Sequence, residues 1–153
     1  MSDTGTHTRG ELLVALSNRI VAIYKELYGK GPVKVRTWYL DDLVLCVCRG
    51  GLTRGELTFV EIGRGDRVAL QRGAFHEAVS PVFAQAVEEI IGRQVETTLH
   101  STDDQSDVST LVFLLQSPEA AALQETDEGL ARERKQMRKK AAEVREASRA
   151  LHD

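Results

Sequence analysis

The stretch from Val33 to Gly51 constrains the fold more than any other part of this sequence. Two runs rich in β-branched, aromatic and aliphatic residues flank Asp41-Asp42, and a Gly-Gly pair closes the second run. Runs of this kind around a two-residue turn are typical of a β-hairpin. The first run has two different faces, whereas the second run is apolar on both. We therefore expect the second strand to lie inside a sheet.

Helical patterns lie on both sides of this hairpin. Apolar residues at three- and four-residue spacing predict an amphipathic helix from Arg9, with Thr8 as its N-cap and Gly29 after its end. After the hairpin, Thr53 and Glu56 have the spacing of a capping box, which predicts a short helix to about residue 61.

A longer helix is predicted from about Asp66 to Ile91. Pro81 should bend it or split it, because a proline inside a helix removes a backbone hydrogen bond. Its expected inner face consists of Val68, Phe75, Val79, Val82, Phe83, Ala86, Val87, Ile90 and Ile91. A second hairpin should follow, with strands at 94–101 and 107–116 around an acidic loop.

The order helix, hairpin, helix, hairpin, helix predicts an α+β fold. We expect a two-layer sandwich with a four-stranded antiparallel sheet made of the two hairpins, plus a C-terminal helix. The predicted parts are a disordered N-terminus at 1–8, an α+β domain at 9–116 and a charged helical extension at 117–153, interrupted near Gly129. Because the second face of such a sheet often meets another subunit, a homo-oligomer is expected.

Composition narrows the class of protein. The 153 residues fit one domain, and the net charge of −3 argues against a general nucleic-acid binder, which is usually basic. The longest uninterrupted apolar run, 111–115, is far shorter than the roughly 20 residues that span a bilayer. There is no N-terminal signal pattern, and two cysteines cannot form a disulfide framework. These features predict a soluble, cytoplasmic protein.

The end of the chain has an uneven charge. Residues 101–128 hold seven acidic residues and no basic one, whereas residues 129–153 hold eight basic residues and four acidic ones. Apolar residues spaced by seven in the last helix are Leu130, Met137, Val144 and Leu151. This thin stripe fits a coiled coil, a docked helix or a solvated helix. The basic side chains could also approach anionic lipid or nucleic acid.

Lys34, Arg36 and Thr37 are the candidate binding residues. A guanidinium beside a hydroxyl and further lysines suits a small anion such as phosphate or carboxylate. The alternative is that Arg36 is a structural residue, paired with an acidic side chain of another strand or helix.

Other patterns fall short of a catalytic or metal site. Cys46 and Cys48 lie on one strand face too far apart for an unstrained disulfide, and we interpret them as buried small residues. His76-Glu77 begins a zinc-protease motif, but Ser80 occupies the position of the second histidine. The loop acids Asp103, Asp104 and Asp107 lack the pattern of a calcium loop. No catalytic residue, metal ligand or cofactor site is therefore predicted.

Several short segments together resemble one family. They are Gly29-Lys30-Gly31-Pro32, Val35-Arg36-Thr37, Asp41-Asp42, Leu43-Val44-Leu45, Gly51-Leu52-Thr53, Glu56 and the run from Val87 to Val95. This pattern is similar to the MpsC family, named after a sodium-translocating membrane-potential-generating system, over about residues 9–116. The resemblance implies a small soluble protein linked to membrane cation or inorganic-carbon transport, without an established enzymatic role.

Two functional hypotheses follow. The first is a non-enzymatic accessory or regulatory protein that is homo-oligomeric through its sheet and works with a membrane transporter complex. The second is a binding module for nucleic acid or an acidic partner that uses the basic terminal helix. Nucleic acid is the less favoured partner because of the net negative charge.

Overall fold

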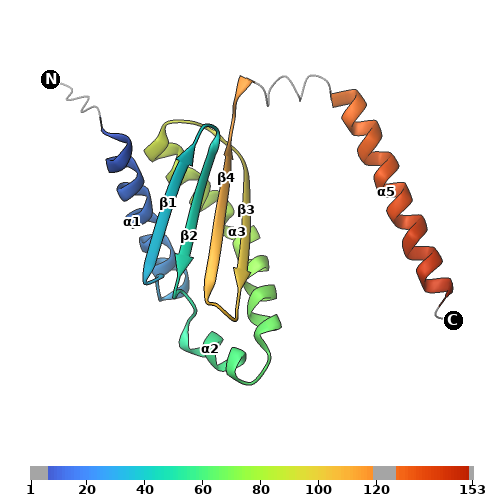
Figure 1. Cartoon of the computed structure of the whole chain (residues 1–153), viewed down its shortest axis with the longest axis horizontal. Coiled ribbons are helices and arrows are strands. Elements are labelled where there is room, and N and C mark those ends of the chain that lie inside the picture. Colours follow the sequence, from blue (N-terminus) through green and yellow to red (C-terminus); the bar gives the residue numbers. More distant parts are fainter. Residues whose placement is uncertain (1–6, 119–126, 152–153) are drawn as a thin grey trace. The chain divides into compact units, whose positions relative to one another are not determined.

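Four antiparallel strands form a single sheet in the order β1-β2-β4-β3. The strands are β1 (Lys34–Leu40), β2 (Leu43–Arg49), β3 (Val95–Asp103) and β4 (Val108–Leu115). The computed structural model describes residues 7–118 and 127–151. In it, α1 (Arg9–Tyr28) and α3 (Gly65–Ile91) lie on one face of the sheet (Figure 1). The predicted two-layer α+β fold, with the second strand inside the sheet, is confirmed.

The first hairpin closes at Asp41-Asp42, and Asp41 adopts a left-handed backbone with φ of 49°. Arg93, after α3, holds this turn in place. Its guanidinium donates to the Asp42 carboxylate at 2.5 Å, to the Asp41 carbonyl at 2.9 Å and to the Gln116 carbonyl at 3.0 Å. One side chain thus links the turn to the end of β4.

The capping box predicted at Thr53 and Glu56 is present, and the predicted N-cap Thr8 also forms one with Glu11. At α1 the Thr8 hydroxyl accepts from the Glu11 amide, and the Glu11 carboxylate accepts from the Thr8 amide. Thr53 and Glu56 make the same pair of bonds at α2 (Arg54–Glu61). Each box satisfies two amides that have no partner within the helix.

The helix α3 continues through Pro81, so the predicted split does not occur. Proline cannot donate to the carbonyl of Glu77, but the Ser80 hydroxyl donates to that carbonyl at 3.3 Å. The predicted inner face needs correction. Arg72 and His76 are buried, whereas Phe75 and Val82 are 37% and 45% exposed.

The hydrophobic core lies between the two helices and the covered face of the sheet. Its fully buried members are Leu16, Ile20, Val44, Cys46, Phe83, Val87, Leu111 and Phe113. Alternate residues of β2 and β4 provide the strand side, as the period of two in a strand requires.

The chain divides into two units, residues 1–116 and 117–153. The second contains α5 (Asp127–Ala150), and this helix includes Gly129, so the predicted interruption there is wrong. Met137, Val144 and Leu151 are exposed, at 67%, 68% and 86%. The expected disordered segment lies largely outside the described residues.

Candidate functional site

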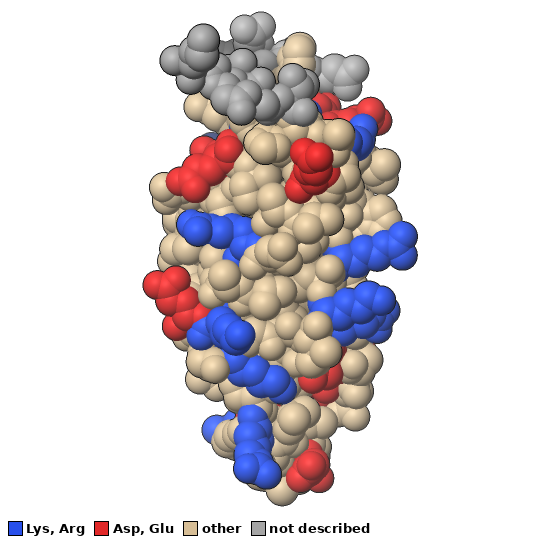
Figure 2. All heavy atoms as spheres, turned by 90° about the vertical axis from the view of Figure 1, so that its left-hand side faces the viewer, with Lys and Arg blue, Asp and Glu red and all other residues tan. Residues whose placement is uncertain are grey.

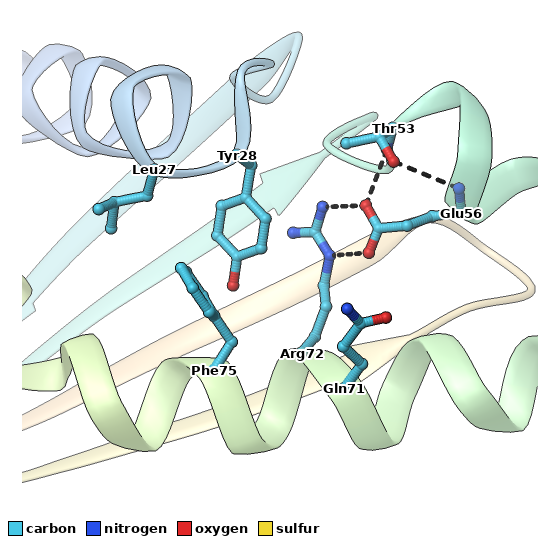
Figure 3. Close-up of a pocket in the computed structure, with 7 residues that line it drawn as sticks. All are labelled: Leu27, Tyr28, Thr53, Glu56, Gln71, Arg72 and Phe75. Atoms are coloured by element: carbon cyan, nitrogen blue, oxygen red, sulfur yellow. Dashed lines mark hydrogen bonds and ion pairs between the residues drawn. The ribbon is translucent and has the colours of Figure 1, made fainter.

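Arg72 is the most deeply buried charged side chain among the described residues, with 2% exposed. Its Nε donates to Glu56 Oε2 at 2.7 Å, and Nη2 donates to Glu56 Oε1 at 2.6 Å and to the Gly51 carbonyl at 2.9 Å. The guanidinium carbon lies 4.2 Å from the centroid of the Tyr28 ring. Figure 3 shows this two-pronged ion pair between α3 and α2.

The ion pair fixes the charge state of both partners. Burial raises the pKa of Glu56, but the hydrogen bonds from Arg72 and Thr53 outweigh burial, and the net pKa is lowered. Burial likewise lowers the pKa of Arg72, and the bonds to Glu56 reverse that effect. Both groups remain ionised near neutral pH, so the carboxylate is not free to act as a base.

A hollow of about 280 Å³ lies beside this pair. It is lined by Leu27, Tyr28, Thr53, Glu56, Gln71, Arg72 and Phe75 (Figure 3). Burial raises the pKa of Tyr28, so its hydroxyl is neutral. The lining holds no nucleophile beside a free base, which acid–base or covalent catalysis would need. We interpret the cluster as a clamp that holds α2 and the β2–α2 linker against α3.

The structure brings together only two of the three predicted anion-binding residues. Lys34 and Arg36 lie on the open face of the sheet, where they line a hollow of about 220 Å³ with Trp38, Val47 and Arg49. Thr37 points to the covered face, and its hydroxyl shares hydrogen bonds with Ser17 and with the Cys46 thiol. The three residues alternate along β1, so the guanidinium and the hydroxyl point to opposite faces.

Arg36 stacks on an aromatic ring. Its guanidinium carbon lies 4.7 Å from the centroid of the Trp38 ring. No acidic side chain within residues 7–118 and 127–151 forms an ion pair with it at 4.0 Å or less. Anion binding by Lys34 and Arg36 stays a prediction, without help from Thr37.

The acids of the β3–β4 turn have contacts within the domain. Asp107 Oδ1 accepts from the Leu52 amide at 3.0 Å, and the Asp107 carbonyl accepts from the Gly50 amide at 3.0 Å. The Asp104 carboxylate lies so close to Gly65, at the start of α3, that a Cβ atom would clash with it. The negative charge of this carboxylate also interacts favourably with the partial positive charge at the N-terminus of α3. This turn therefore anchors the neighbouring segments.

His76 of α3 and His100 of β3 stack on each other. The rings of His76 and His100 have centroids 4.3 Å apart, and the buried Nε2 of His76 has no hydrogen-bond partner among the described residues. Burial, then the positive charges of His76 and Arg72, lower the pKa of His100 to about 4. Burial also lowers the pKa of His76, so both rings are neutral near pH 7.

The two cysteines are buried in the core, as expected. Burial raises the pKa of Cys46 to about 11 and that of Cys48 to about 12, which leaves both thiols protonated and unreactive. Among residues 7–118 and 127–151, no group of three or more His, Cys, Asp or Glu side chains could hold a metal ion.

No helix of residues 7–118 covers the open face of the sheet (Figure 1). Leu40, Leu99 and Leu114 are 58%, 52% and 38% exposed. The half-buried apolar residues beside them are Trp38, Leu43, Leu45, Val47 and Val112. An exposed apolar surface of this kind is typical of an interface.

Arg72, His76 and Asp107 are structurally important residues that the sequence did not reveal. Arg72 and His76 follow Val68 at intervals of four and therefore continue its helical stripe, but a search for apolar residues excludes them. The spacing of Thr53 and Glu56 did reveal the cap. It could not reveal that the same carboxylate binds Arg72, 16 residues further along.

Comparison with known proteins identifies the family. Neither a curated protein nor a solved structure matches the chain. No helix in the described part of the chain is long and apolar enough to cross a membrane. A family model described as "Na+-translocating membrane potential-generating system (MpsC)" matches residues 8–117, close to the span of the resemblance seen in the sequence. With more than two thirds of its length matched, the chain belongs to the MpsC family.

Proposed function

We propose that this protein is a non-enzymatic accessory or regulatory protein of a membrane system that translocates sodium and generates a membrane potential. The family match over residues 8–117 carries this proposal. The ion pair between Arg72 and Glu56 supports the non-enzymatic part, because both carboxylate oxygens accept hydrogen bonds from Arg72 and the carboxylate is not free to act as a base.

The proposed place of action is the cytoplasmic surface of the membrane, reached through a partner. The side formed by α1 and β1 supports this, since its basic residues outnumber its acidic ones. The bases are Arg9, Arg19, Lys25, Lys34 and Arg36, and the acids are Glu11 and Glu26. Figure 2 shows this side, with Lys and Arg side chains spread over its middle and lower parts. Such a surface suits an acidic transporter segment beside an anionic membrane.

The test uses membrane vesicles of the source organism from which this protein has been removed. A voltage-sensitive dye would record the sodium-dependent potential before and after the purified full chain is added back. We expect the full chain to restore the potential. A potential that is the same with and without the protein would overturn the proposal.

A charge-reversal pair identifies the surface. R19E/K25E changes two exposed bases of α1, and R67E changes an exposed base of α3 as the matched control. We expect the double variant to lose restoration at physiological salt and R67E to retain it. Equal restoration by both would remove the α1–β1 side from the proposal.

A second candidate function rests on α5. Its eight Lys and Arg residues are exposed, as are its apolar residues Met137 and Val144. This helix could bind an acidic partner or nucleic acid. Binding of a duplex or single-stranded oligonucleotide that weakens steeply with salt would support this function. Salt-independent binding of the oligonucleotide, or none, would exclude nucleic acid as the ligand of α5.

A further inference from the structure

The open face of the sheet is ordered in four cross-strand rows. The strand register places Lys34, Arg49, Val108 and Asp103 in one row and Arg36, Val47, Thr110 and Ser101 in the next. The third row is Trp38, Leu45, Val112 and Leu99, and the fourth is Leu40, Leu43, Leu114 and Thr97. Two rows are thus almost entirely apolar, and the first has a base at one end and an acid at the other.

A second copy of the same face complements these rows. A two-fold axis parallel to the strands, midway between β2 and β4, exchanges β1 with β3 and β2 with β4 in the facing copy. Each row then faces the same row of the second copy, with the order of the four strands reversed, as in an isologous interface. Trp38 faces Leu99 of the second copy, and Leu45 faces Val112. Lys34 faces Asp103, and this charge pair occurs twice.

The charges favour this axis over the other two-fold arrangement. An axis across the strands would place Lys34 and Arg49 of one copy against the leucine row of the other. The favoured axis gives Lys34 a facing carboxylate and places Arg49 opposite Val108, one strand away from that carboxylate. It therefore leaves fewer charges buried without a partner, and burying such charges would cost free energy. In the favoured arrangement the Asp103 carboxylate is already held, since it accepts from the Gln105 amide at 3.3 Å and from the Ser106 hydroxyl at 2.8 Å.

The sheet is less suited to extension at its edges. The outer strand β1 carries Lys34 and Arg36, and the outer strand β3 has an irregular register between Val95 and Thr97. Charged side chains and bulges on edge strands disfavour pairing with another chain. Face-to-face packing of two sheets with nearly aligned strands needs no free edge.

The size of the face is sufficient for a specific contact. Four strands about 4.8 Å apart, each some seven residues long, cover a flat area of roughly 450 Å². Side-chain relief increases this area, so two copies would bury on the order of 1,000 Å² or more, where specific interfaces begin.

We propose that the occupant of the open face is a second copy of this chain, in a face-to-face dimer whose two-fold axis runs along the strands. The dimer does not depend on the proposed transport role. It covers Lys34 and Arg36 of β1, whereas the exposed α1 bases Arg9, Arg19 and Lys25 lie outside the open face. Failure of the vesicle experiment would therefore leave the dimer untouched, and a monomer would leave the vesicle experiment valid.

The first test measures the mass of the full chain in solution by sedimentation equilibrium. We expect twice the chain mass for the wild type and a dissociation constant at least about tenfold higher for L45E, which places an unpaired carboxylate in the centre of the interface. L70E is the matched control, because Leu70 is 76% exposed on α3 and lies outside the face. Circular dichroism would check that both variants stay folded.

The second test reads the direction of the axis. K34E and D103K should each weaken the dimer severalfold, and the double variant K34E/D103K should restore it, because the two charges face each other only between copies. A monomeric wild type, or a dimer unaffected by L45E, would overturn the proposal. A dimer that L45E breaks but the charge swap does not restore would overturn the stated axis.

Discussion

The two faces of the sheet are made of the same strands but differ in what their polar and apolar groups contact. On the covered face, apolar side chains such as Leu111 and Phe113 are fully buried, and the Thr37 hydroxyl is paired with Ser17. On the open face, leucines remain exposed and Arg36 rests on Trp38 without an acidic partner among the described residues. The apolar residues of the covered face are buried within one chain, whereas the open face is the surface that we propose a second copy covers.

The largest effect should come from equal leucine truncations on the two faces. L111A removes a fully buried side chain and should cost about 2–5 kcal/mol in the free energy of unfolding. L45A, on the neighbouring strand but on the open face, should cost about 1 kcal/mol or less in the dilute monomer. Urea unfolding at low protein concentration would measure both. Equal costs would contradict the difference between the faces.

The next effect concerns the buried ion pair on the helix side. E56Q keeps the shape but leaves the Arg72 guanidinium buried without a counter-charge, which should cost roughly 2–3 kcal/mol. D66N, which breaks the exposed Arg64–Asp66 pair, is the matched control and should leave the unfolding midpoint unchanged. The comparison fails if both variants unfold at the same urea concentration.

The histidine stack predicts a dependence of stability on pH. His100 has a pKa of about 4 in the folded chain, against an ordinary value of 6.5, and His76 is shifted in the same direction. Between these values the unfolded chain binds more protons than the folded one, so stability is full above pH 6.5 and falls as the pH drops towards 4.

We expect this loss to be roughly 1–2 kcal/mol, reduced by the partial exposure of the His100 ring. H100Q should flatten the profile between pH 6.5 and 4. Loss of the Glu56 charge acts at lower pH, because its pKa lies below the ordinary value. If the free energy of unfolding of the wild type does not change between pH 6.5 and 4, burial of the two histidines does not make the stability depend on pH, and the prediction is wrong.

The smallest effect comes from one substitution made on both faces. T37V removes the Thr37 hydroxyl, which lies 2.8 Å from the Ser17 hydroxyl and shares a hydrogen bond with it. The Ser17 hydroxyl loses this partner, which should cost about 1 kcal/mol in the free energy of unfolding. T110V, on the open face, should cost nothing measurable or should stabilise the dimer. Thermal unfolding of the two variants side by side would detect the difference. A larger loss for T110V would reverse the assignment of the faces.

The local parts of the fold could be predicted because their signals are short in sequence. Thr53 and Glu56 are three residues apart and form the expected capping box, and Thr8 is the expected N-cap of α1. Because β2 is apolar on both faces, it was predicted to lie inside the sheet. The strand order confirms this, since β2 has β1 on one side and β4 on the other. Pro81 does not split α3, and the Ser80 hydroxyl donates to the Glu77 carbonyl that an amide at position 81 would otherwise bond.

The remaining features depend on contacts between distant residues. Arg72 is buried because the Glu56 carboxylate neutralises its charge and the Gly51 carbonyl accepts one of its hydrogen bonds, and no spacing rule connects these positions. In the sequence Asp107 is only a loop acid without a metal-binding pattern, yet its carboxylate accepts from the amide of Leu52 across the domain. The predicted anion-binding residues do not all lie together, for a simpler reason. Arg36 and Thr37 are adjacent in a strand, and their side chains therefore point to opposite faces of the sheet.

The most direct measurement uses Trp38, the only tryptophan of the chain, which lies on the open face. If a second copy covers that face, the emission of Trp38 should move to longer wavelengths on dilution, over the same concentration range in which the mass falls by half. L45E should show the long-wavelength emission at every concentration. An emission spectrum that stays constant while the dimer dissociates would contradict the central claim, because the indole would then lie outside the interface.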